Sequence, residues 1–135
     1  MPKLLGKIKP VSVLRVSLGF SYLYSGYDLF VHPTGWHWVI RPLPEFVQTI
    51  INDVIGTDVY LRTQGIAEMG MAFLFLAWFL PKIGVRLAAF LSTVQMALIL
   101  IFVGLTLETF RDIPILGASL AVFLMTFKKH GSTTK

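Results

Sequence analysis

Four long apolar stretches, separated by polar breaks, account for most of the chain. Their expected limits are residues 11–30, 61–80, 85–105 and 113–127. A helix rises about 1.5 Å per residue, so roughly 20 apolar residues cross a hydrocarbon core about 30 Å thick. The pattern therefore predicts an all-α fold, an integral membrane four-helix bundle, in which residues 1–135 form a single domain.

The longest polar break is the loop of residues 31–57, which is rich in proline and carries Trp36 and Trp38. Within it, residues 45–56 place apolar and polar side chains on opposite faces of a helix. The apolar face has Phe46, Val47, Ile50, Ile51, Val54 and Ile55, and the polar face has Glu45, Gln48, Thr49, Asn52 and Asp53. This predicts a short amphipathic helix, ended by Gly56, that lies on the membrane surface or caps the bundle. Loop anchoring and gating are both open as its role.

Composition agrees with a membrane environment. Apolar residues make up 55% of the chain and charged residues 14%, whereas soluble domains have about 45–50% apolar residues. The net charge is +5, but the basic residues form no patch interleaved with aromatics, so nucleic acid is not an expected partner. The chain has no cysteine, which excludes thiol chemistry by this chain alone. The basic N-terminus resembles a signal peptide, but the apolar run is too long and lacks a small-x-small cleavage site, so it is expected to stay as the first span.

Charge also predicts the topology. Basic residues fall mainly at the two termini and at the turn between the second and third stretches: Lys3, Lys7, Lys9, Arg15, Lys82, Arg86, Lys128, Lys129 and Lys135. Acidic residues fall on the other side: Asp28, Glu45, Asp53, Asp58, Glu68, Glu108 and Asp112. By the positive-inside rule, both termini are cytoplasmic in a multi-pass protein of the plasma membrane.

Glu68 lies inside the second apolar stretch, where a carboxylate costs on the order of 3 kcal/mol on insertion scales. The helical rise places Glu68, Asp112 and Asp28 about 18, 22 and 26 Å from the cytoplasmic ends of their helices. They are therefore expected to converge in the outer half of the bilayer. This predicts a vestibule bounded by Glu68, Asp28, Arg111 and Asp112 and roofed by the loop that carries His32 and His37.

The candidate catalytic residues are Glu68 and Asp28, and the candidate ligand-binding residues are Arg111, Asp112, Gln95 and His32. Glu68 has two readings, a protonatable group for quinol chemistry or one half of an ion pair with Arg111 that locks the bundle. Gln95 also has two interpretations: its amide donates a hydrogen bond to a ligand carbonyl, or it forms a hydrogen bond with a neighbouring helix.

Several cofactor motifs are missing from the sequence. A haem between spans needs histidines that face each other, but His32 and His37 share one loop and His130 lies at the opposite membrane face. We found no phosphate-binding glycine loop, nucleophile elbow or zinc-protease motif. No metal and no covalently bound cofactor are expected.

A family resemblance extends over almost the whole chain. The run LRVSLGFSYLYSGYD of residues 14–28, followed by Pro33 and Trp36, resembles the opening of DoxX/DoxD-like membrane proteins. The segment from Gly65 to Glu68, and the pair Arg111 and Asp112 followed by Gly117, are similar to later parts of that family. The resemblance implies a four-helix membrane bundle, and family members include the small subunit of a thiosulfate:quinone oxidoreductase.

The chain departs from that family at one position that could bind an anionic substrate. Leu29 stands where the family often has a lysine after the glycine-x-aspartate of the first span. If that lysine binds an anionic substrate in the family, its absence argues against thiosulfate chemistry for this chain, unless Arg111 supplies the cation.

The sequence thus leads to three hypotheses. The first is a membrane subunit of a quinone-linked redox system, with quinone as cofactor and a redox enzyme subunit as partner. The second is a non-enzymatic assembly, anchoring or interaction subunit of a membrane complex. The third is a small proton-coupled carrier, which would need a homo-oligomer because four spans enclose little pathway. Whether the chain is itself an enzyme is open at this point.

Overall fold

The computed structural model describes residues 9–127, which are mostly helical and contain no strand. The helices are α2 (Pro10–Val31), η1 (Pro33–Val39), α3 (Glu45–Thr49), η2 (Ile50–Ile55), α4 (Thr57–Leu76), α5 (Lys82–Phe102), η3 (Thr109–Arg111) and α6 (Asp112–Met125). The all-α prediction is therefore confirmed. Lys3, Lys7, Lys128, Lys129, His130 and Lys135 lie outside the described residues.

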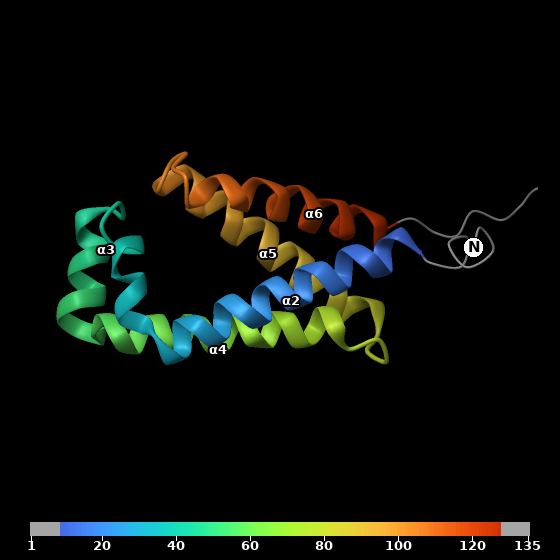
Figure 1. Ribbon diagram of the computed structural model, residues 1–135, viewed down its shortest axis with the longest axis horizontal. Coiled ribbons are helices and arrows are strands. Elements are labelled where there is room, and N and C mark those ends of the chain that lie inside the picture. Colours follow the sequence, from blue (N-terminus) through green and yellow to red (C-terminus); the bar gives the residue numbers. More distant parts are fainter. Residues whose placement is uncertain (1–8, 128–135) are drawn as a thin grey trace, which may run out of the picture.

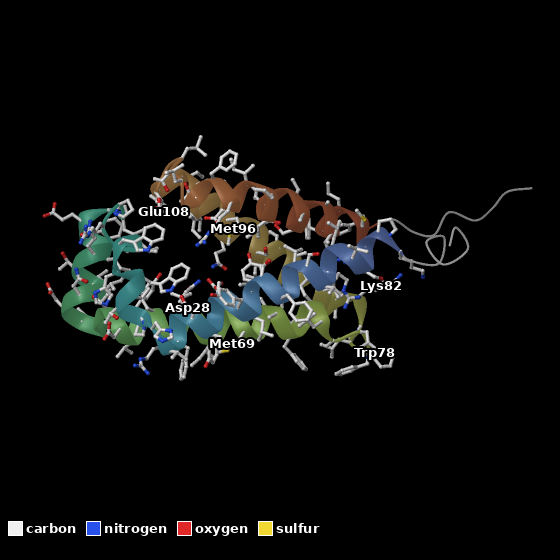
Figure 2. The ribbon with its side chains drawn as sticks, viewed as in Figure 1. Asp28, Met69, Trp78, Lys82, Met96 and Glu108 are labelled. Carbon is white, nitrogen blue, oxygen red and sulfur yellow. The ribbon has the colours of Figure 1, made fainter. Side chains whose placement is uncertain are left out.

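The four long helices form two antiparallel pairs, α2 with α4 and α5 with α6. Figure 1 shows that the pairs meet near the start of α2 and the end of α6, and diverge toward the end that carries α3. Lys82 lies at the first end, and Asp28 and Glu108 lie toward the second, as Figure 2 shows. The expected separation of charge is therefore present for these residues, although Arg111 of η3 is near the acidic end.

The main core lies where the pairs meet. It is built from buried side chains of all four long helices: Leu18, Tyr22, Met71, Ala72, Phe75, Val85, Ala88, Ala89, Met96 and Val122. A second cluster, formed by Leu29, Ile40, Ile51 and Leu61, fixes the loop and η2 against α2 and α4. The loop is thus anchored by its own apolar residues rather than left as an open connection.

The backbones of α2 and α4 touch where Gly26 faces Gly65. A Cβ built on Gly65 would lie 2.5 Å from the Gly26 oxygen, and one on Gly26 would lie 2.7 Å from the Gly65 oxygen. Small residues allow such close approach between helices. Gly70 and Gly117 make no such contact, because open space surrounds a Cβ at either position.

The second apolar stretch does not form one helix over residues 61–80 as expected. α4 begins earlier, at Thr57, and ends at Leu76, with Ala77 in extended conformation. Arg15 contributes to this end, because its Nε donates to the Phe75 oxygen at 3.1 Å and its other guanidinium nitrogen donates to the Ala77 oxygen at 3.3 Å. Basic groups stabilise the unpaired carbonyls of a helix C-terminus.

The amphipathic helix is present as α3 and η2, and Gly56 ends it with a φ of 89°. The second of these helices has π geometry. Ile51 is buried, whereas Phe46 and Val54 are 69% and 78% exposed. The apolar face is therefore only partly packed against the bundle.

Within residues 9–127, α5 is the helix that is long and apolar enough to cross a membrane by length and composition, with a mean hydropathy of 2.0. α6 has only 14 residues. α2 and α4 are longer, but they carry charged residues such as Arg15, Asp28, Arg62 and Glu68.

Candidate functional site

A cavity of about 780 Å³ lies between the two helix pairs. Side chains of α2, the loop, α4, α5 and α6 line it, and most are apolar or aromatic, including Leu29, Trp36 and Trp38. Its polar lining residues include Ser25, Gln64, Glu68 and Gln95, together with Glu108, Arg111 and Asp112 near the η3 turn. The volume falls within the range of about 300–1,000 Å³ typical of small-molecule sites.

Glu68 is the centre of the first polar group and is only 5% exposed. The Ser25 hydroxyl donates to its Oε2, and the Gln95 amide donates to its Oε1 at 2.8 Å. The Gln64 amide reaches the same Oε1 at 3.4 Å. We call these four residues the Glu68 cluster. It joins α2, α4 and α5 through one carboxyl group.

Local geometry explains how the Glu68 cluster forms. Gln64 and Glu68 are four residues apart, so they share one face of α4. Ser25 precedes Gly26, whose contact with Gly65 brings α2 against α4 at this level. Gln95 reaches across from α5 and connects the two helix pairs.

The sequence left open an ion pair between Glu68 and Arg111. In the structure the hydrogen-bond partners of the Glu68 carboxyl are instead neutral side chains. Among residues 9–127, the close contacts between a basic and an acidic side chain are those of His32 with Asp28 and of His37 with Asp58. Arg111 lines the cavity but forms no ion pair with Glu68 there.

The turn before α6 forms the polar mouth of the cavity, with Glu108, Arg111 and Asp112. The buried Thr109 hydroxyl holds this turn by donating to the Gly104 oxygen at 2.6 Å. The backbone N–H of Glu108 and the Thr106 hydroxyl keep the pKa of the Glu108 carboxyl below its usual range. The mouth therefore presents both an anionic and a cationic side chain to the solvent.

Asp28 and His32 do not line the cavity, although the sequence placed Asp28 in the vestibule and His32 above it. Asp28 instead accepts a hydrogen bond from Trp36 Nε1 at 2.8 Å, and its other oxygen is 3.1 Å from His32 Nδ1. Trp36 is a lining residue. Asp28 therefore acts on the cavity by fixing a tryptophan in its wall.

Three residues that form or support the cavity were not predicted from the sequence. Gln64 could have been found from its i,i+4 spacing to Glu68. Tyr22 and Ser92 form a buried hydrogen bond of 2.6 Å between α2 and α5, and Tyr22 lines the cavity. Nothing in the sequence paired Ser92 with Tyr22.

Comparisons with known proteins assign no family to the chain. No family model matches it, and no curated protein or solved structure matches it either. The chemistry of the cavity must therefore be argued from its own residues.

Proposed function

We propose that the chain is a DoxX/DoxD-like protein with four membrane spans. Large apolar side chains on the outside of every long helix support the membrane spans, including Phe20 at 60%, Phe73 at 58%, Ile101 at 72% and Leu124 at 57% exposure. Apolar surface on this scale is rare on monomeric soluble proteins and marks contact with lipid or protein. In this proposal the protein is multi-pass in the plasma membrane and both termini are cytoplasmic.

The topology can be tested with single cysteines, since the chain has none of its own. Thr34→Cys lies in the loop and Lys82→Cys at the first residue of α5. We expect a membrane-impermeant maleimide to label Thr34→Cys in intact cells and Lys82→Cys only after permeabilisation. Equal labelling of both sites in intact cells would contradict the topology.

For the cavity we propose a quinone, held by a membrane subunit of a quinone-linked redox system. The observation that carries this proposal is Glu68, buried in a largely apolar cavity and surrounded by three neutral hydrogen-bond donors. A quinone has the matching chemistry, because it is an apolar ring with two carbonyl oxygens.

Four polar residues of the cavity have roles in this proposal. Gln95 uses one amide N–H on Glu68 and has a second for a quinone carbonyl. Reduction of a quinone to a quinol adds two protons with the two electrons: the Glu68 carboxyl exchanges the proton of one oxygen as general acid or base, and water at the polar mouth exchanges the other. A partner redox enzyme supplies the two electrons and the oxidisable substrate, while Arg111 and Asp112 at the polar mouth face that partner or its substrate.

Quinone binding is tested by thermal unfolding of the protein in lipid nanodiscs with and without decylubiquinone. A ligand at about 100 times its Kd stabilises the native state by about 2.7 kcal/mol, so Tm should rise. Gln95→Ala should weaken binding about tenfold, because one hydrogen bond contributes about 1 kcal/mol or somewhat more. Asn52→Ala removes an exposed amide outside the cavity and should bind like the wild type.

An unchanged Tm for the wild type at saturating quinone would contradict the quinone proposal. That result would favour the non-enzymatic role in assembly or anchoring. Uptake into liposomes that depends on a proton gradient would instead favour the carrier.

A further inference from the structure

We propose that the cavity opens sideways between α4 and α5, and that the hydrocarbon tail of its ligand passes through this opening into the lipid. The inference rests on the proposed function and narrows the ligand to a long-tailed quinone. We call the rim formed by Ala67, Leu91, Val94 and Leu98 the lateral opening.

The rim residues belong to the cavity and to the outer surface at once. Leu91, Val94 and Leu98 line the cavity, yet they are 43%, 39% and 47% exposed. Their spacing of three and four residues places them along one face of α5. Ala67 of α4 also lines the cavity and is exposed. A side chain that meets both conditions marks an edge where the cavity reaches the surface.

The packing of the helices explains why a space lies between the two pairs. α2 and α4 are in backbone contact at Gly26 and Gly65, and α5 packs along α6. The space is therefore left between the pairs, which diverge in Figure 1. Ala67 has a small side chain, so it fills little of the α4 edge of the opening.

The chemistry of the rim identifies the end of the ligand that lies there. Ala67 and Val94 directly precede Glu68 and Gln95, which are joined by a 2.8 Å hydrogen bond. A ring bound at the Glu68 cluster therefore has the lateral opening next to it. The opening is apolar, whereas the mouth beside η3 carries Glu108, Arg111 and Asp112. A hydrocarbon tail matches the first exit and not the second.

The opposite seam, between α2 and α6, offers a poorer exit for a tail. Its exposed cavity residues are Ser21 and Tyr24 of α2, each of which carries a hydroxyl group. A hydrocarbon tail is stabilised by contact with apolar surfaces and not by contact with polar groups. The α4–α5 seam therefore fits the tail better.

The test compares two quinones that share a ring, decylubiquinone and the tail-less 2,3-dimethoxy-5-methyl-1,4-benzoquinone. Leu98→Trp fills the lateral opening, whereas Leu120→Trp adds the same volume to α6 at a leucine that is 42% exposed and outside the cavity. Val94→Trp repeats the obstruction at a second position. Kd values are measured in nanodiscs for each protein and each compound.

We expect Leu98→Trp and Val94→Trp to raise the Kd of decylubiquinone about tenfold, as for a lost contribution of about 1.4 kcal/mol, and to leave that of the tail-less ring within twofold. Leu120→Trp should change neither. An unchanged Kd for decylubiquinone, or equal weakening of both compounds, would overturn the lateral opening while quinone binding itself stood. Failure of both compounds to bind the wild type would overturn the proposed function and the opening together.

Discussion

Replacing Gly65 with valine should separate α2 from α4 and remove most of the folded protein. The new Cβ would meet the Gly26 oxygen at 2.5 Å and the Phe30 nitrogen at 2.9 Å. Both are backbone atoms and cannot turn away as a flexible side chain can. Overpacking in a tight contact costs about 1–3 kcal/mol or more, and here it also disturbs Ser25 beside the crossing.

Gly70→Val is the matched control, since it places the same β-branched residue in the same helix where the Cβ meets open space. Size-exclusion chromatography and Tm measure both variants. We expect a large loss of monodisperse protein for Gly65→Val and little change for Gly70→Val. Equal behaviour of the two would show that the backbone contact does not hold the pair together.

Substitutions at Glu68 should separate its contribution to folding stability from its contribution to quinone turnover. Glu68→Ala removes the acceptor of three hydrogen bonds, which leaves Ser25, Gln64 and Gln95 without their partner. At about 0.6–1 kcal/mol for each hydrogen bond, the expected cost is about 2 kcal/mol. Glu68→Gln keeps an acceptor oxygen of the same reach, so it should accumulate and unfold much like the wild type.

The two variants should nevertheless share one defect. An amide cannot exchange a proton as a carboxyl group does, so quinone turnover with the partner enzyme should fall by about 10²–10⁴-fold in both. Glu45→Gln changes an exposed carboxyl outside the cavity and should retain full turnover. Normal turnover in Glu68→Gln would reduce Glu68 to a structural acceptor that joins three helices.

Features set by local sequence were predictable. Pro10–Val31 and Asp112–Met125 end within two residues of the apolar stretches that predicted them. The amphipathic helix of the loop and its end at Gly56 follow from spacing and from the freedom of glycine at positive φ. These elements depend on neighbours in the chain, which the sequence displays directly.

Features set by distant contacts were not predictable. α4 ends before Pro81 in part because Arg15, from another helix, binds its last carbonyls. Helices that are apolar on most sides carry little information on which face meets a partner, so Gly65 could not be told from Gly70. The partners of Glu68 on α2 and α5 depend on how the helix pairs are set against each other.

The measurement that tests the central claim most directly is the quinone content of the protein from its native membrane. The tagged chain is captured with its surrounding lipid, and the bound quinone is extracted and counted by mass spectrometry. The account predicts a stoichiometric quinone in the wild type, retained in Asn52→Ala and depleted in Gln95→Ala. Quinone at no more than the level of the bulk lipid, and equal in all three proteins, would contradict it.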